Sequence, residues 1–398
     1  MVINESNKKV NPRRVTILGS TGSIGCNTLD LIRSNPNAYK IEALTANTNF
    51  ELLAAQAKEM KASLAVVADE KKYKALKNEL SGCSTEAAAG VSGLIEAATR
   101  PAEWVMAGIV GAAGLKPTLA AIKRGVVVAL ANKECLVCAG DLIIAEVERS
   151  GSTLLPVDSE HNAIFQVFES DQRHAIEKII LTASGGPFWG SDLATMKKAT
   201  PKEAVAHPNW EMGRKISVDS ATMMNKGLEL IEAHYLFSLE EDQIEILVHL
   251  ESIIHSLVAY VDGSVLAQLG SPDMRTPISY ALGWPKRISA PSPKLDLAAI
   301  GTLNFQSTDP IMFPAIGLCR QALRDGDSAP AILNAANEVA VAAFLKRKIG
   351  FLDIATTVEW TLNKFAKTPI HSLEDVFFVD QEARIIAGER VSATTVVG

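Results

Sequence analysis

The segment 158–162 places five polar side chains directly after an apolar run, and their types suit metal binding. Residues 154–157 read LLPV, and DSEHN follows. In an extended chain, side chains two positions apart point to the same side, so Asp158 and Glu160 can face one ligand. Neighbouring carboxylates repel unless a cation lies between them, and hard oxygen ligands suit Mg²⁺ or Mn²⁺ rather than Zn²⁺. Taken alone, the segment fits a solvated acidic loop equally well, and His161 is more typical of packing or helix capping than of metal binding.

A second polar block, residues 206–233, favours the metal site and adds a phosphate site. Hydroxyl, amide and ammonium donors lead into a helix predicted to begin near Met224, and such donors suit a phosphate monoester. These donors are Ser220, Thr222, Asn225 and Lys226. Glu229 follows Lys226 on the same helical face and can supply a third carboxylate beside the phosphate. Glu232 is the rival for that role, although an acid at such a position is more often exposed.

Three further segments carry polar groups that could bind a substrate or a cofactor. Ser184 precedes a glycine pair at a predicted strand end, where it is a further phosphate donor. The segment 207–213, HPNWEMG, has the features of a mobile flap with Trp210 as an apolar lid, and a buried Trp in a fixed loop is the alternative. The segment 132–134, NKE, ends a predicted parallel strand, where doubly wound sheets bind ligands. Lys133 could reach a substrate hydroxyl, while its two neighbours meet a nicotinamide ribose.

A glycine-rich loop follows the first predicted strand. The sequence LGSTGSIG at 18–25 places Gly19, Gly22 and Gly25 between a strand and a helix, where backbone amides can approach a pyrophosphate. The spacing differs by one residue from the usual dinucleotide fingerprint, so the strand–loop–helix context carries the prediction. The next strand ends in TANTN at 45–49, without an acid to hold a ribose 2′-hydroxyl. This neutral end leaves room for a 2′-phosphate and favours NADPH.

Alternating strands and helices must position these groups. Predicted strands cover 14–18, 40–46, 63–68, 103–111 and 126–132. Their alternation with helical segments predicts an α/β fold, a doubly wound, Rossmann-like NADPH-binding domain over 1–157 with helices on both faces of a parallel sheet. Mixed strands and helices then predict an α+β domain over 158–284 that carries the catalytic, metal and substrate residues. A Pro- and Ser-rich linker over 285–311 leads to a C-terminal α-helical domain over 312–398.

The composition narrows the functional classes. A chain of 398 residues suggests two or three domains, and its net charge of -6 gives no general attraction to nucleic acid or anionic membranes. Residues 1–14 lack the apolar segment of a secretory signal and are interpreted as a short solvated arm. Five thinly spread cysteines predict reduced thiols in the cytoplasm. Cys135 and Cys138 form a C-x-x-C without a second pair, which is more typical of helix packing than of a redox or zinc site.

Several long motifs together closely resemble the 1-deoxy-D-xylulose 5-phosphate reductoisomerase family. They are GSTGSIG, ANKE, LLPVDSEHNAIFQ, SGGPF, HPNWEMGRKISVDSATMMNKGLELIEA, GSVLAQLGSPDMRTPI and LNAANEVAVAAFL. The resemblance implies rearrangement and reduction of 1-deoxy-D-xylulose 5-phosphate to 2-C-methyl-D-erythritol 4-phosphate in non-mevalonate isoprenoid biosynthesis. It also implies NADPH and a divalent cation (Mn²⁺, Mg²⁺ or Co²⁺) as cofactors, and a homodimer of V-shaped subunits with a C-terminal helical bundle.

The resemblance also assigns residues to roles. It implies cofactor contacts at Thr21, Gly22, Ser23, Ile24, Asn47, Asn49, Asn132, Glu134 and Gly213, and metal ligands at Asp158, Glu160 and Glu229. It implies substrate contacts at Lys133, Ser159, Glu160, Ser184, His207, Ser220, Asn225, Lys226 and Glu229, with the phosphate among Ser184, Ser220, Asn225 and Lys226. Catalytic roles fall to Lys133, Asp158, Glu160, His207 and Glu229. The family often has Gly and then Lys or Arg where this chain has Asn47 and Thr48, so a weaker preference for NADPH over NADH is expected.

Two other functional classes fit parts of the pattern. A different two-domain NADP dehydrogenase would reduce a sugar or semialdehyde without rearrangement, and its product would keep an unbranched carbon skeleton. A non-enzymatic NADP-binding regulator would not need three convergent carboxylates, and it would show no metal dependence. The resemblance does not distinguish retroaldol and aldol steps from a direct shift for the rearrangement.

Overall fold

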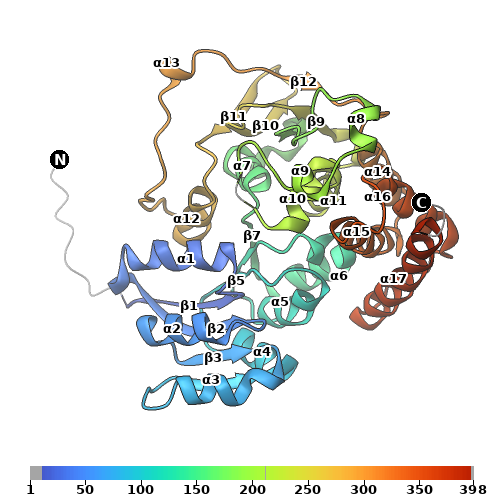
Figure 1. The fold of residues 1–398 in the computed structure, drawn as a ribbon. Coiled ribbons are helices and arrows are strands. Elements are labelled where there is room, and N and C mark those ends of the chain that lie inside the picture. The colour runs from blue at the N-terminus through green and yellow to red at the C-terminus, as the bar shows by residue number, and fades with distance from the viewer. Residues whose placement is uncertain (1–10, 211, 396–398) are drawn as a thin grey trace, which may run out of the picture.

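A seven-stranded parallel sheet forms the N-terminal part of the computed structural model, which describes residues 11–210 and 212–395 (Figure 1). Its strands are β1 (Arg13–Leu18), β2 (Tyr39–Ala46), β3 (Leu64–Val67), β4 (Glu86–Ala89), β5 (Trp104–Ala107), β6 (Val127–Leu130) and β7 (Thr153–Pro156). Their order is β4-β3-β2-β1-β5-β6-β7, so the direction of winding reverses between β1 and β5. Ligands of doubly wound sheets bind at such a reversal, beyond the carboxyl ends of the strands. The predicted arm before β1 begins in residues 1–10, which lie outside the described residues.

Helices cover both faces of this sheet, as predicted. They are α1 (Ser23–Arg33), α2 (Phe50–Met60), α3 (Tyr73–Glu79), α4 (Gly90–Thr99), α5 (Leu115–Ile122) and α6 (Glu134–Ser150). Side chains alternate between the faces along β1, because Val15 and Ile17 pack in the core under α1 and α2, whereas Leu18 packs in the core under α4 and α5. The helix α12 (Arg275–Gly283) joins the first of these cores from far along the chain, and the indole of Trp104 donates a hydrogen bond to the carbonyl oxygen of Ala281 at 2.9 Å.

A second, mixed sheet forms the central region. Its strands are β8 (Ile176–Ala183), β9 (Ile244–Val248), β10 (Ile254–Tyr260), β11 (Val265–Leu269) and β12 (Gln306–Ser307), in the order β11-β10-β8-β9-β12. The pair β8 and β9 is parallel and the other pairs are antiparallel. The helices of this region are α7 (Ser159–Val167), α8 (Leu193–Lys197), α9 (Pro201–Ala204), α10 (Arg214–Ala221) and α11 (Met224–Phe237). The helix predicted near Met224 is thereby confirmed, and it packs between the sheet and the C-terminal helices.

The C-terminal region is helical, as predicted. After a connector that contains α13 (Leu297–Ile300) and runs along the outside of the molecule in Figure 1, the chain forms α14 (Pro314–Asp325), α15 (Ala329–Leu345), α16 (Asp353–Lys364) and α17 (Leu373–Thr395). The central helix α15 packs against α16 and α17 and also contacts α6 and α10. One apolar core continues from the seven-stranded sheet through the central region into these helices. The C-terminal helices therefore support elements that carry candidate site residues.

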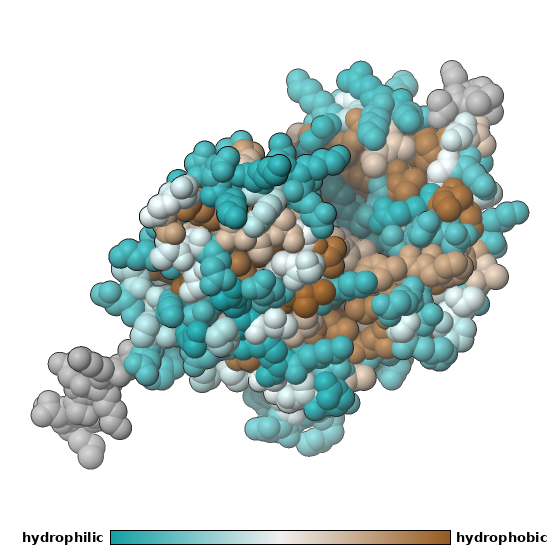
Figure 2. Space-filling view, turned by 90° about the horizontal axis from the view of Figure 1, so that it is seen from below, coloured by the Kyte–Doolittle hydropathy of each residue, from teal (hydrophilic) through white to brown (hydrophobic). Residues whose placement is uncertain are grey.

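The surface and the cysteines agree with the composition. On the face seen in Figure 2, hydrophilic side chains cover most of the surface and apolar ones form patches between them. Within 11–210 and 212–395, no helix combines the length and apolarity needed to cross a membrane. All five cysteines are free, and Cys135 and Cys138 are buried in α6, which confirms that they act as packing residues.

Candidate active site

The loop between β1 and α1 has the backbone geometry of a phosphate cradle. Gly19 has a φ of +87°, and a Cβ there would lie 2.6 Å from the carbonyl oxygen of Gly108. A Cβ on Gly25 would lie 2.4 Å from the carbonyl oxygen of Gly19, so only glycine allows the loop to fold this tightly. Gly22 caps α1, whose first turn holds no acidic residue. The positive end of the helix dipole and the exposed backbone around Gly22 and Ser23 therefore suit a pyrophosphate.

A buried glutamine from α2 holds this loop in place. Gln56 donates from its Nε2 to the carbonyl oxygen of Ser20 at 3.0 Å, and Ser20 donates from its hydroxyl to the Oε1 of Gln56 at 2.8 Å. Thr45 at the end of β2 adds bonds from the other side, because its Oγ1 and its carbonyl oxygen accept from the amides of Gly19 and Ser20 at 2.8 and 2.7 Å. Gln56 was not singled out from the sequence. A polar residue in the otherwise apolar row of α2, with Leu53 and Ala57 beside it, was the signal that could have found it.

The end of β2 is neutral, as predicted. Asn47 and Thr48 are exposed, and Asn49 caps α2 by accepting a hydrogen bond from the amide of Leu52 at 3.1 Å. The nearby ammonium of Lys72 lies 5.6 Å from the centre of the Phe50 ring. A ribose 2′-phosphate at this edge would meet the amide and hydroxyl groups of the loop after β2.

The predicted segment 132–134 lies at the start of α6, and the side chains of Asn132 and Lys133 make different contacts. The amide of Asn132 donates to the carbonyl oxygens of Ile109 and Gly111, the latter at 3.0 Å, and its Oδ1 accepts from the amide of Cys135 at 3.2 Å. Asn132 thus fastens the loop after β5 to the first turn of α6. Lys133 instead turns toward the carboxylates after β7, described next.

Asp158, Glu160 and Glu229 converge. Each offers a carboxylate oxygen, and these ligand atoms all lie within 4.8 Å of one another. The expected extended geometry of 158–160 is wrong, because Asp158 is the N-cap of α7 and accepts a hydrogen bond from the amide of Glu160 at 3.4 Å. The two acids nevertheless point the same way, since the chain turns into a helix between them. Three hard oxygen donors at this spacing fit one divalent cation such as Mg²⁺ or Mn²⁺.

Two lysines from different elements lie among these carboxylates. The Nζ of Lys133 lies 2.8 Å from the Oδ2 of Asp158 and 3.1 Å from the Oε1 of Glu229. The Nζ of Lys226 lies 2.8 Å from the Oε1 of Glu160 and also donates to Glu229. Asn225 accepts from Lys133 at 2.8 Å and donates to Glu229. Six predicted site residues thus form one network in which two ammonium groups face three carboxylates, leaving negative charge for a cation.

The network shifts the pKa values of two neighbouring acids, Asp158 and Glu160, in opposite directions. Burial, together with the charge of Glu229, raises the pKa of Glu160 to about 8. Burial also acts to raise the pKa of Asp158, but the charges of Lys133 and His161 and the hydrogen bonds to Asp158 together outweigh it and lower that pKa. Asp158 is therefore ionised under all ordinary conditions, while Glu160 depends on a nearby cation to stay ionised. Ser159 adds a hydroxyl that donates to the Oε2 of Glu160 at 2.5 Å.

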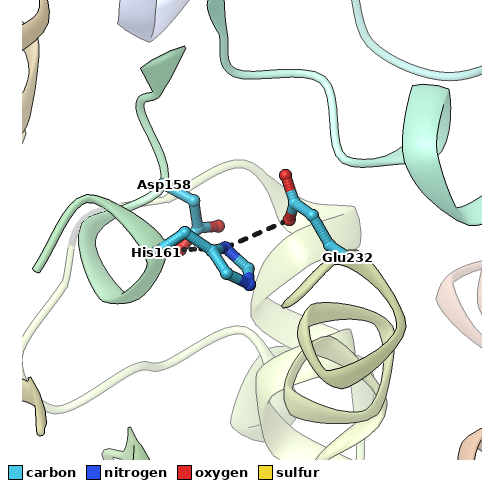
Figure 3. A group of neighbouring side chains, drawn as sticks. All are labelled: Asp158, His161 and Glu232. Carbon is cyan, nitrogen blue, oxygen red and sulfur yellow. Dashed lines mark ion pairs between the residues drawn. The ribbon is translucent and has the colours of Figure 1, made fainter. Parts of the chain in front are cut away.

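Asp158, His161 and Glu232 form a second group of neighbouring side chains, which shares Asp158 with the first (Figure 3). The Nε2 of His161 lies 2.8 Å from the carbonyl oxygen of Glu229, which can only accept, so Nε2 carries a proton. Its Nδ1 lies 3.2 Å from the Oε2 of Glu232 and 3.8 Å from the Oδ1 of Asp158. The expectation of an exposed Glu232 is wrong, because its side chain is 1% exposed and burial raises its pKa to about 7. His161 thus joins α7, with two carboxylates, to α11, with the third.

Ser184 and His207 form a pair at the end of β8. The Nδ1 of His207 accepts from the amides of Asn209 and Trp210 at 3.1 and 2.9 Å, so its Nε2 carries the proton and donates to the Oγ of Ser184 at 2.8 Å. Burial lowers the pKa of His207, which keeps the imidazole neutral. A neutral imidazole in this tautomer orients the serine hydroxyl toward a further acceptor.

Glycines bring the loop after β8 against α10. Gly186 has a φ of +68°, and a Cβ there would lie 2.8 Å from the carbonyl oxygen of Ser220. Ser184 and Ser220 therefore belong to segments in direct contact. In the segment predicted as a flap, Trp210 is half-buried with its ring centre 6.2 Å from that of His255, and Glu211 lies outside the described residues. The motion of the segment 207–213 stays a prediction.

The glycine loop and the carboxylate network occupy the same edge of the seven-stranded sheet. The loop follows β1, Lys133 follows β6 and Asp158 follows β7, and β5 lies between β1 and β6. Neighbouring strands are spaced by about 4.8 Å, so about 10 Å separates the ends of β1 and β6, and about 14 Å separates those of β1 and β7. An extended dinucleotide can cross such an interval. The predicted residues therefore form two groups that one cofactor can connect.

Comparisons with known proteins agree with this arrangement. Residues 15–140 match the family model of 1-deoxy-D-xylulose 5-phosphate reductoisomerase, and residues 154–237 and 269–386 match the models of two C-terminal domains of the same enzyme. The chain is 59% identical to the 1-deoxy-D-xylulose 5-phosphate reductoisomerase of Rhodospirillum centenum over 96% of this chain and 95% of the relative. It is 57% identical to that of Zymomonas mobilis over 94% of this chain and 97% of the relative.

Solved structures show the same likeness. The structure of the Zymomonas mobilis enzyme in complex with NADPH has a TM-score of 0.92 and 56% identity, covering 96% of this chain and 99% of that one. A DOX-P reductoisomerase in complex with NADPH, fosmidomycin and magnesium has a TM-score of 0.91 and 45% identity, covering 96% of this chain and 98% of that one.

Proposed function

Because the chain belongs to the 1-deoxy-D-xylulose 5-phosphate reductoisomerase family, we propose that the network around Glu229 is its active site. The protein is an enzyme that converts 1-deoxy-D-xylulose 5-phosphate to 2-C-methyl-D-erythritol 4-phosphate with NADPH and a divalent cation. The observation that carries the assignment is the convergence of Asp158, Glu160 and Glu229 within 4.8 Å, on the sheet edge that also holds the glycine loop.

We propose Asp158, Glu160 and Glu229 as the metal ligands. A divalent cation held by carboxylates supplies a Lewis acid that polarises substrate oxygens, and NADPH supplies the hydride. The chain contributes the charge balance, because the ammonium groups of Lys133 and Lys226 lie beside the same acids. With the acids engaged by a cation, Lys133 is a donor for a substrate hydroxyl and Lys226 for a phosphate.

We propose that Ser184, Ser220, Asn225 and Lys226 bind the substrate phosphate. The neutral imidazole of His207 holds the Ser184 hydroxyl by donating to it, which leaves the hydroxyl proton free to point at the phosphate. Contacts to this remote group contribute orientation at the reacting carbons. Trp210, from the segment 207–213, excludes water when that segment closes over the substrate.

We propose that the cofactor runs along the sheet edge. The backbone of residues 21–24 holds the pyrophosphate, Asn47 and Asn49 lie at the adenosine end, and Asn132, Glu134 and Gly213 lie at the nicotinamide end. The positions support this order, because the first group follows β1 and β2 while the second lies at the start of α6 and α10. The direction places the hydride donor beside the carboxylate network.

We also propose that the enzyme is a cytoplasmic homodimer. The edge strand β11 and the turn before it expose Val261, Val265 and Leu266, and an apolar edge strand favours association with another chain. Five free cysteines suit a reducing compartment.

The decisive test is product identification with the purified enzyme, 1-deoxy-D-xylulose 5-phosphate, NADPH and Mn²⁺, with and without chelator. The proposed site predicts a branched product that requires the metal, and an unbranched polyol would instead indicate a dehydrogenase without rearrangement. The Glu229→Gln variant should bind NADPH as the parent enzyme does and lose most turnover, because one ligand charge is gone. An unchanged rate at saturating metal would remove Glu229 from the ligand set.

A further inference from the structure

A buried carboxylate on α10 joins this helix to the C-terminal helix α15. Asp219 is 1% exposed, and each of its oxygens has one partner. Its Oδ1 accepts from the Nδ2 of Asn337 at 2.8 Å, and its Oδ2 lies 2.8 Å from the Nζ of Lys215, one helical turn earlier. A buried carboxylate is costly unless it is paired and hydrogen-bonded, and both conditions are met here. Asp219 therefore has a defined orientation between α10 and α15.

Lys215, the second partner of Asp219, also contacts the NADPH-binding domain. The Nζ of Lys215 also lies 3.6 Å from the Oε1 of Glu134, the first residue of α6. Although burial acts to lower the pKa of Lys215, the charges of Asp219, Glu134 and Glu338 outweigh it and raise that pKa, so the side chain is an ammonium ion. One cation thus bridges α10 of the central region and α6 of the NADPH-binding domain.

The position of this bridge matters because of its neighbours. Gly213 is the N-cap of α10, only two residues before Lys215, and its carbonyl oxygen accepts from the amide and hydroxyl of Ser217 at 3.0 and 3.1 Å. Gly213 and Glu134 are both proposed contacts of the nicotinamide half of the cofactor. An ion pair that sets the distance between α10 and α6 therefore sets the width of the site between them.

We propose that Asp219 is a positioning residue that aims Lys215 at Glu134, and so fastens α10 beside the nicotinamide half of NADPH, with Asn337 of the C-terminal helices fixing Asp219. The inference rests on the cofactor position proposed above. It gives the C-terminal helical region a function in cofactor binding, although no residue of α15 has been proposed to touch the cofactor. Asp219 itself acts through Lys215.

Four variants of the full chain test this inference by titration of NADPH fluorescence without metal or substrate. Lys215→Met keeps the aliphatic stem but removes the ammonium, and Asp219→Asn keeps the shape but removes the charge. The exchange Asp219→Asn with Asn337→Asp restores an amide–carboxylate pair between α10 and α15 while leaving Lys215 without its helical partner. Lys367→Met, which removes an ion pair with Asp325 elsewhere in the C-terminal region, is the matched control.

We expect Lys215→Met and Asp219→Asn to raise the Kd for NADPH by about fivefold or more, and Lys367→Met to leave it within about twofold. The exchange should recover the melting temperature lost in Asp219→Asn but not the affinity for NADPH, because Lys215 still lacks its partner on α10. A purely structural contact would recover both. The inference is overturned if Lys215→Met binds NADPH as the parent does, or if the exchange restores affinity. Parent enzyme that fails to bind NADPH would instead overturn the proposed cofactor site.

Discussion

The imidazole of His161 is bonded to the backbone of Glu229, with its Nε2 2.8 Å from the carbonyl oxygen. This bond runs between the two helices that share the proposed metal ligands, since Asp158 and Glu160 lie at the start of α7 and Glu229 lies in α11. The distance between the helices therefore depends on His161, which is not one of the three proposed ligands. The spacing of the carboxylates depends on it in turn.

Replacing His161 should therefore weaken metal binding. We expect His161→Phe, which keeps a buried ring but cannot donate, to raise the Kd for Mn²⁺ by about 10-fold, in the range found for groups that support metal ligands. His161→Gln, whose amide can still donate to the carbonyl, should lose less. Manganese titration followed by electron paramagnetic resonance measures both, and NADPH affinity serves as the control. Equal Mn²⁺ affinity in all three proteins would show that the bond does not position the ligands.

Replacing Gln56 should weaken cofactor binding without affecting the metal. Gln56→Leu removes both bonds to Ser20 and takes the amide donor from its buried carbonyl oxygen, whereas the Ser20 hydroxyl can still donate to the carbonyl oxygen of Thr45 at 3.2 Å. The free energy of unfolding should fall by about 1–3 kcal/mol. Because the released loop must be ordered again on binding, the KM for NADPH should rise while the kcat at saturating NADPH stays near that of the parent. A fall in kcat with an unchanged KM would contradict this assignment.

Adding a cation at the end of β2 should sharpen cofactor selection. Thr48 is exposed beside Asn47 and Asn49, and an arginine there could pair with a ribose 2′-phosphate. We expect Thr48→Arg to raise the ratio of kcat/KM for NADPH to that for NADH by about 10-fold. Thr48→Gln is the uncharged control of similar length, and a gain of equal size in that variant would exclude charge as the cause.

Burial of His255 should make stability depend on pH. Desolvation lowers its pKa to about 4, so between the unfolded value of about 6.5 and about 4 the unfolded chain binds a proton that the folded chain does not. The stabilising contribution is full above pH 6.5 and is lost as the pH falls to about 4, a loss of up to about 3 kcal/mol. In denaturant unfolding, the free energy of unfolding of His255→Asn should fall less than that of the parent between pH 6.5 and about 4. His174→Asn, at an exposed histidine, should match the parent. Equal slopes in all three would contradict the assignment.

Polar residue types at strand ends and on one predicted helix, together with the family resemblance, were sufficient to predict which groups converge here. The network of Lys133, Asp158, Glu160, Asn225, Lys226 and Glu229 unites residues from three segments, and parallel strands must end at one edge. The glycine loop was predicted because its backbone has few alternatives. Local pattern and strand topology carry information about such positions before any packing is known.

Groups whose role depends on packing were not predictable. Glu232 has the sequence context of a surface acid, and only the approach of His161 from α7 explains its burial. The edge strand β4 reads EAAA and is half exposed, without the β-branched or aromatic residues that favour strands, so its pairing with β3 depends on tertiary context. Gln56 stands out as a polar residue in α2, but its partner, Ser20, lies in the loop after β1.

The contact between Trp104 and Ala281, 177 positions apart, has a consequence for synthesis on the ribosome. By the time residue 157 has emerged, all seven strands of the first sheet are available, yet the helix that covers Trp104 has not been made. Domains usually fold as they appear, N-terminal first. Here the first domain can reach only a partly covered intermediate during translation, and we expect that intermediate to need protection from aggregation until residue 283 has left the exit tunnel.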